Sequence, residues 1–246
     1  METVDMFSCG RVQYSGSERL RYFSRQLLTA DDMRTEQEYF REKQRRHNRL
    51  LHGAGTVCGL EVMADPEAGP MAVKICPGYA LGPLGDEIYA AEPVSLDLVQ
   101  CARPAPAPCT PAEAQPAMTA GSFDVYVQIR YVELLTRPTR TLPAGCGCDE
   151  TACEYSRIRD GFEVRCVRNL SAGSTEHSLC EIEKKGPKPP PCLPCPDDPW
   201  LVLAKVQLTR DSGGAVTMGN GAIDNTVRRM IYATRQIQSQ LISSCC

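Results

Sequence analysis

Five cysteines in two short clusters are the residues of this chain best suited to metal chemistry. The first cluster has the spacing C-x-C-x4-C (Cys146, Cys148 and Cys153), and the second has the spacing C-x2-C (Cys192 and Cys195). Thiolates this close together reach a single ion, and two such turns complete a tetrahedral site. Four thiolates favour zinc, or iron, over hard cations. The pattern predicts a structural metal; disulfides and unlinked thiols are the alternatives.

The remaining reactive residues do not form a catalytic pattern. The chain has three histidines; His47 and His52 lie five residues apart, without the H-E-x-x-H spacing of a zinc protease. The sequence contains no G-x-S-x-G motif and no Walker-type glycine loop. Cys58 and Cys166 lie in apolar, strand-like runs, where burial as small hydrophobic residues is expected. We therefore expect a protein without enzymatic activity.

Charge and hydropathy limit the classes of partner. The 246 residues carry a formal net charge of -3, which provides no general attraction to nucleic acid or anionic membranes. No apolar run approaches the roughly eighteen residues of a membrane span. Acidic residues occupy the N-terminus where a signal peptide has lysines. We expect synthesis in the cytoplasm, with later release as part of a particle left open.

A helix is predicted ahead of the first glycine cluster. Thr29 and Asp32 have the spacing of a capping box, and no glycine or proline interrupts the chain from there to Leu51. Acidic residues come early and arginines late, as the helix dipole favours. Met33, Phe40 and His47 form a narrow stripe suited to one line of contact. Gly53 and Gly55 are expected to end the helix.

The middle of the chain is predicted to be mainly strands. Two hairpins are indicated, one from residues 56–63 and 71–76, and one from residues 78–81 and 87–90. Residues 123–131 alternate between apolar and polar types, which is typical of an antiparallel sheet packed on one face. Residues 162–167 and 201–208 are further strand candidates. The fold class is therefore α+β, mainly an antiparallel sheet or sandwich with an N-terminal and a C-terminal helix.

The second helix is expected at the end of the chain, from about Asn225 to Ile242. Its N-cap would be Asp224 or Asn225. Apolar residues recur at helical steps and form a stripe: Val227, Met230, Ile231, Ile237 and Leu241.

Two proline-rich tracts, 101–121 and 184–199, interrupt the strands. Proline cannot donate a hydrogen bond within a central strand, so both tracts are expected to be surface excursions. The predicted organisation is an N-terminal helical segment (1–55), a β-rich domain (56–222) and a C-terminal helix (223–246). A division into two domains at 101–121 is the alternative.

Several motifs together resemble a bacterial family found among components of phage tail-like contractile injection systems. They are Arg21-Tyr22-Phe23-Ser24 with Gln26-Leu27-Leu28-Thr29, Glu36-Gln37-Glu38-Tyr39, His47-Asn48-Arg49-Leu50-Leu51-His52-Gly53, Val57-Cys58-Gly59-Leu60-Glu61-Val62, Pro77-Gly78-Tyr79-Ala80-Leu81 with Gly85-Asp86-Glu87-Ile88, Cys153-Glu154-Tyr155-Ser156-Arg157-Ile158-Arg159, Asp198-Pro199-Trp200 and Asp224-Asn225-Thr226-Val227-Arg228-Arg229-Met230. The resemblance covers most of the chain outside the proline tracts. Its N-terminal block is fairly specific, whereas its glycine turns are not.

The resemblance implies a non-enzymatic subunit of a large assembly, in or attached to the baseplate of such a particle. Its partners would be other subunits and several copies of itself, not nucleic acid. It also implies an interaction surface at five residues (Glu36, His47, Asn48, Arg49 and His52), for which helix termination and local hydrogen bonding are the alternative. A ligand- or receptor-binding, fibre-like module, or a stand-alone zinc-stabilised binding protein, is the alternative function.

Overall fold

The computed structural model describes residues 17–102, 120–140, 153–171, 195–234 and 237. The chain forms two compact units, Met1–Arg46 and His47–Cys246. Strands dominate the second unit, and they pair antiparallel within each sheet, which confirms the α+β class. In the part of the chain that is described, no helix has the length and apolar character needed to cross a membrane.

The first unit contains the predicted helix as α1, Ala30–His47. Its capping box is confirmed: the Thr29 backbone N–H donates to Asp32 Oδ2 at 2.9 Å, and the Asp32 backbone N–H donates to Thr29 Oγ1 at 3.1 Å. α1 buries none of its residues, and Met33 and Phe40 of the predicted stripe are 54% and 56% exposed. Its polar residues form i,i+3 ion pairs, such as Arg34 with Asp31.

The helix ends in one π-helical turn, η1, Asn48–His52. The Gly53 N–H donates to the Asn48 carbonyl at 3.0 Å, and Gly53 has a φ of 74°. Glycine adopts this left-handed conformation at little cost, so the predicted helix end at Gly53 is confirmed.

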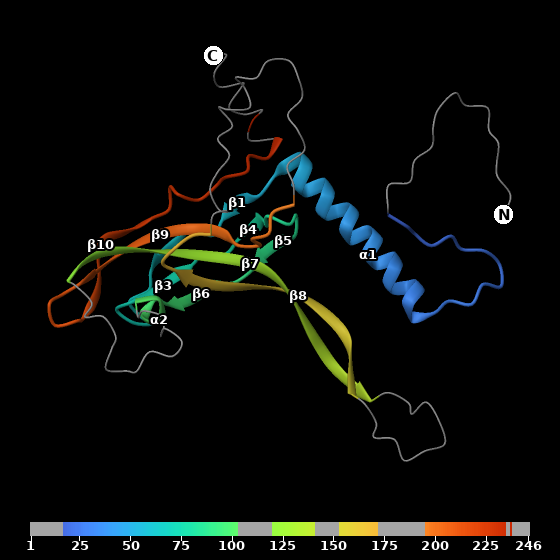
Figure 1. Ribbon diagram of the computed structural model, residues 1–246, viewed down its shortest axis with the longest axis horizontal. Helices are drawn as coiled ribbons and strands as arrows, with labels where there is room; N and C mark the ends of the chain where they lie inside the picture. The colour runs from blue at the N-terminus through green and yellow to red at the C-terminus, as the bar shows by residue number, and fades with distance from the viewer. Residues whose placement is uncertain (1–16, 103–119, 141–152, 172–194, 235–236, 238–246) are drawn as a thin grey trace. The chain divides into compact units, whose positions relative to one another are not determined.

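The second unit contains three sheets that share one core (Figure 1). The first has the order β1 (Gly55–Gly59), β4 (Gly78–Leu81) and β5 (Glu87–Ala90). The second has the order β2 (Val62–Ala64), β3 (Ala72–Ile75) and β6 (Val94–Asp97), and α2 (Val99–Ala102) follows β6. The third has the order β10 (Val216–Asp224), β9 (Leu201–Arg210), β7 (Gly121–Arg140) and β8 (Cys153–Val167). The predicted hairpin of residues 78–81 and 87–90 is present as β4–β5. The other is present only in part, as β2–β3, because the predicted strand 56–63 is divided and its first part, β1, pairs with β4.

The alternation predicted for residues 123–131 corresponds to the core face of β7. Val125, Val127 and Ile129 are fully buried in the shared core. The opposite face is not open to solvent at Gln128, which is 1% exposed. Arg165 covers it, since the Arg165 Nε donates to Gln128 Oε1 at 3.0 Å. The sheet is therefore covered locally on both faces.

β7 and β8 extend far beyond the predicted strands. They pair in one unbroken register from Tyr126↔Val167 to Arg140↔Cys153, whereas β9 pairs with β7 only as far as Ile129. Residues 130–140 and 153–163 therefore form a two-stranded ribbon, here called the arm, which Figure 1 shows continuing after β9 has ended. The sequence analysis identified the bases of these strands and missed the arm.

The predicted C-terminal helix is wrong at its start. Residues 225–232 are not helical; the Thr56 N–H donates to the Arg229 carbonyl, and the Ile231 N–H donates to the Thr56 carbonyl, both at 2.8 Å. These bonds make a parallel bridge between β1 and Met230, so pairing with a distant strand overrides the local helical pattern. One helical bond, from the Ile237 N–H to the Ala233 carbonyl, follows, and most of the later residues lie outside the described part.

The expectations for two single cysteines have different outcomes. Burial of Cys58 is wrong: it is exposed, where β1 bulges in its pairing with β4. Cys166 packs against the core as expected, but it is not an unlinked thiol, because it forms a disulfide with Cys101 in α2. The bond closes a sequence separation of 65 residues and ties the start of the first proline tract to β8.

Candidate interaction site at the end of the first helix

Asn48 fixes the π-helical turn within the second unit. Its side chain is 5% exposed, and Nδ2 donates to the Gly85 carbonyl at 2.9 Å. Gly85 belongs to the β4–β5 turn, which is closed by the Gly82 N–H donating to the Asp86 carbonyl at 2.8 Å. Asn48 is thus a structural link between the helix end and this turn, in line with the helix-termination alternative.

Arg49 links the same turn to the segment before β9. Its Nη1 donates to the Cys195 Sγ at 2.9 Å, while its buried Nε has no hydrogen-bond partner among the described residues. His47 and His52 lie edge to face with ring centroids 5.5 Å apart, and both are exposed. Asn48 and Arg49 therefore attach the turn to the rest of the second unit, whereas the imidazoles of His47 and His52 are accessible.

The end of β1 lies very close to the start of β4, where Gly59 pairs with Gly78. A Cβ on Gly59 would lie 2.1 Å from the Pro77 carbonyl oxygen, and a Cβ on Gly78 would lie 2.4 Å from the Cys58 carbonyl oxygen. Gly59 also has a φ of 63°. Only glycine fits such an approach, which explains the two glycine motifs found in the sequence.

The Asp224–Met230 motif binds the chain around Gly59 and Val62. The Asn225 amide bonds both backbone groups of Val62: Nδ2 donates to the carbonyl and Oδ1 accepts from the N–H, each at 3.0 Å. The Arg228 Nη1 donates to the Gly59 carbonyl at 3.2 Å. Four motifs far apart in sequence therefore meet here, and we call this region the junction (residues 48–62, 77–86, 195 and 225–231).

The Asp198-Pro199-Trp200 motif anchors the start of β9. The Trp200 backbone N–H donates to Asp198 Oδ1 at 3.1 Å. Trp200 is 7% exposed, and its indole ring contacts two guanidinium groups. Arg165 lies 3.8 Å and Arg130 lies 4.7 Å from the ring centroid. Burial lowers the pKa of Arg165, as does the nearby Arg130 charge, whereas Asp198 acts in the opposite direction. This cluster is a cation–π contact that closes the outer face of the sheet.

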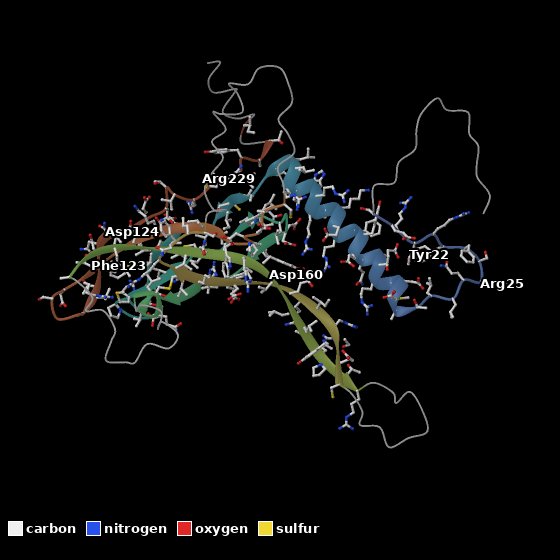
Figure 2. All side chains as sticks on the ribbon, in the orientation of Figure 1. Tyr22, Arg25, Phe123, Asp124, Asp160 and Arg229 are labelled. Carbon is white, nitrogen blue, oxygen red and sulfur yellow. A yellow bond between two sulfur atoms is a disulfide. The ribbon has the colours of Figure 1, made fainter. Side chains whose placement is uncertain are left out.

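At the base of the arm, where Figure 2 labels Asp160, Tyr131 is surrounded by carboxylates. Its hydroxyl donates to Asp160 Oδ1 at 2.6 Å, and Glu133 Oε1 lies 3.4 Å away. Burial raises the pKa of Tyr131 well above its ordinary value, and the hydrogen bond to Asp160 and the charges of Asp160, Glu133 and Asp86 raise it further. This cluster was not predicted from sequence, because its members come from two strands and a turn.

The arm exposes large apolar side chains. Leu134, Leu135, Tyr155 and Ile158 are 53%, 59%, 55% and 56% exposed. An isolated two-stranded ribbon is only marginally stable in water, so an arm with uncovered leucine and isoleucine lacks the packing that strands need. Clustered exposed apolar side chains mark surfaces that other proteins cover. This surface was also missed from sequence, because strand alternation alone does not show that neither face is packed.

The structure separates the predicted site residues. Asn48, Arg49 and Cys195 meet at the junction, while Glu36 lies on α1 in the other compact unit. Of the five cysteines predicted to bind metal, Cys153 and Cys195 are exposed free thiols; Cys146, Cys148 and Cys192 lie outside the described residues. Among the residues that are described, no three His, Cys, Asp or Glu side chains gather as metal ligands.

The chain is weakly similar in structure to chains of two solved baseplate complexes. No protein-family model and no curated protein matches the chain. A chain in the TssK-TssF-TssG baseplate subcomplex of the type VI secretion system is 13% identical over 82% of this chain, with a TM-score of 0.37. A chain in the type VI secretion baseplate complex is 10% identical over 92%, also with a TM-score of 0.37. The matches span 60% and 65% of those chains, and similarity this low carries no conclusion about activity or partners.

Proposed function

We propose that this protein is a non-enzymatic structural subunit of a phage tail-like contractile injection particle, in or attached to its baseplate. The arm carries the proposal, because it presents four large apolar side chains that a monomer leaves in water. Burying one such side chain contributes about 1.5–3 kcal/mol, so a partner that covers the arm gains substantially. The family resemblance of the motifs supports the identity of the assembly.

The junction supports the proposal in a second way. Its motif residues serve to hold backbone segments together: Asn48 binds the Gly85 carbonyl, and Asn225 binds the backbone of Val62. Such fixed contacts give a rigid body from which the arm and the exposed His47–His52 pair can contact neighbours. Synthesis in the cytoplasm, followed by incorporation into a particle, fits this role.

Co-sedimentation with particles tests the function. The chain, tagged in its native host, is expected to sediment with contractile particles, and its deletion is expected to abolish or truncate them. The Leu134→Asp/Ile158→Asp variant is expected to fold and to be absent from the particle fraction. Tyr89→Asp, which changes a 69% exposed residue outside the arm, is the matched control and should be incorporated normally. Intact, active particles from the deletion strain would contradict the proposal.

We further propose that the clustered cysteines hold a structural zinc or iron ion. Thiolate donors suit these metals, and the two described members, Cys153 and Cys195, are outside any disulfide and exposed. Cys153 lies opposite Arg140 at the far end of the arm and Cys195 lies beside Arg49 at the junction, so an ion held by both clusters would require Cys146, Cys148 and Cys192 to complete the ligand set across this separation. Elemental analysis of protein purified without chelator is expected to find stoichiometric metal that Cys192→Ser/Cys195→Ser removes, whereas Cys58→Ser retains it. Metal-free wild-type protein would rule out the site.

A further inference from the structure

The two faces of the arm differ in charge. Register places Leu135 opposite Ile158 and, on the same face one rung nearer the base, Glu133 opposite Asp160. All four residues are exposed at the side chain. Tyr131 donates to Asp160, which orients this carboxylate without neutralising it. We call this side of the arm the acidic face: an apolar pair beside two carboxylates.

The opposite side of the arm has the complementary chemistry. Leu134 pairs with Arg159, and Thr136 pairs with Arg157 on the next rung. A Cβ built on Gly161 would lie 3.1 Å from Leu134 Cδ1 and 3.6 Å from Val132 Cγ2, so both apolar side chains lie over this glycine. Within the described residues neither arginine has a carboxylate partner; Arg157 Nη1 donates to its neighbour's carbonyl, that of Ser156. We call this side the basic face.

The geometry points to a second copy of this chain as the partner of the arm. We infer that the basic face of one arm packs on the acidic face of the next, so that Leu134 covers Leu135 and Ile158 while Arg157 and Arg159 meet Glu133 and Asp160. Stacked β layers lie about 10 Å apart, a distance that arginine and carboxylate side chains span together. The inference deepens the proposed function by naming one contact of the assembly.

The contact would be heterologous, because each copy uses a different face toward each neighbour. Heterologous contacts do not stop at a dimer: they close into rings or continue as filaments. Each arm would then have both faces covered, which removes the exposure of Leu134, Leu135 and Ile158 together. A nucleic-acid partner fits less well, since the four carboxylates of the arm lie among its five arginines and nearly cancel their charge, and the chain carries a net charge of -3.

The mass of the full-length protein in solution tests the contact. Wild-type protein, in light scattering behind size exclusion and in sedimentation velocity, is expected to grow in mass with concentration and to dissociate at high salt. Arg157→Glu/Arg159→Glu, which destroys the basic face, is expected to weaken association ~10-fold or more. Glu133→Lys/Asp160→Lys is expected to weaken it to a similar extent by destroying the acidic face.

Mixing basic-face and acidic-face variants separates this contact from non-specific association. For this purpose Leu134→Asp disables the basic face, and Leu135→Asp/Ile158→Asp disables the acidic face. Each variant alone is expected to remain monomeric. Their mixture keeps one intact acidic face and one intact basic face, so it is expected to form a 1:1 complex that grows no further.

Controls distinguish the contact from misfolding and from net charge. Thermal unfolding must show that each variant is folded. The control Arg21→Glu/Arg25→Glu changes the net charge by the same amount as Arg157→Glu/Arg159→Glu, but on exposed residues outside the arm. It should associate as wild type does. Monomeric wild-type protein at every soluble concentration would overturn the inference, even if the chain joins particles through other proteins. So would variants of the arm that associate normally, or a mixture that stays monomeric.

Discussion

The side-chain amide of Asn225 forms two hydrogen bonds with the backbone of Val62, 163 positions away in the sequence. The amide thus behaves like one more residue of a strand, and it holds the chain after β10 against β2. Thr226 keeps the preceding turn in place by donating its N–H to Asp224 Oδ1 at 2.8 Å. These contacts explain why this segment forms a turn and a bridge, not a helix, despite its helical pattern of apolar residues.

Replacing Asn225 tests the importance of this link. Asn225→Ala leaves the partly buried N–H and carbonyl of Val62 without partners, so the free energy of unfolding should fall by about 2–3 kcal/mol. Asn225→Asp keeps only the acceptor and should lose less. Denaturant unfolding at constant m-value measures both. An alanine variant as stable as wild type would show that water replaces the amide fully.

Gly59 offers a test of the close backbone approach between β1 and β4. Gly59→Ala places a Cβ 2.1 Å from the Pro77 carbonyl oxygen, at a φ of 63°, and the conformation alone costs roughly 1–2 kcal/mol. We expect a loss of several kcal/mol, seen as a large drop in Tm or as insoluble protein. Gly219→Ala is the matched control, because nothing lies within 4 Å of its added Cβ. Equal effects of the two substitutions would refute this account.

Tyr131 should make stability depend on alkaline pH. Because the pKa of Tyr131 is raised in the folded state, its neutral hydroxyl stabilises the fold fully below the ordinary tyrosine pKa of 10.0. That contribution is lost as pH rises from 10 toward the folded-state pKa. Relative to Tyr131→Phe, wild type should therefore be more stable at pH 7, by about 1 kcal/mol, and lose this advantage above pH 10.

The pH profile needs a second tyrosine as its reference. Tyr89→Phe alters a 69% exposed ring and should run parallel to wild type across the same range. Urea unfolding at closely spaced pH values supplies the curves. If the Tyr131→Phe and wild-type curves remain parallel to pH 11, the bond to Asp160 has no influence on titration.

The Cys101–Cys166 disulfide is expected to stabilise the second unit under oxidising conditions. Bridging 65 residues restricts the unfolded chain, and such bonds typically contribute about 2–4 kcal/mol. Cys101→Ser should lower Tm in the absence of reductant and should have little effect in its presence. Cys58→Ser, at an exposed free thiol, should leave Tm unchanged. A reductant-independent effect of Cys101→Ser would show that packing, not the bond, is what was lost.

The elements that depend on interactions between residues close in the sequence could be predicted from the sequence. The Thr29–Asp32 capping box joins residues three positions apart, and Gly53 ends the helix through a bond to Asn48 five positions away. The alternation in residues 123–131 reports burial on one face, which the core position of Val125 and Val127 confirms. The α+β class followed from such patterns, because the spacing of apolar residues along a helix or strand reflects which side chains are buried.

Tertiary structure decided what depends on partners distant in sequence. Residues 225–231 carry a helical stripe, yet bonds to Thr56 and Val62 keep them out of a helix, since unpaired backbone groups beside a strand cost more than a helix gains. The pairing of Cys101 with Cys166 likewise required the fold. Leu134 and Ile158 look like ordinary strand residues, and only the register of β7, β8 and β9 shows that, in the described part of the chain, no third strand pairs with the arm. The sequence therefore determined the elements that depend on local interactions, while the fold determined the C-terminal segment, the arm and the surfaces that stay open for a partner.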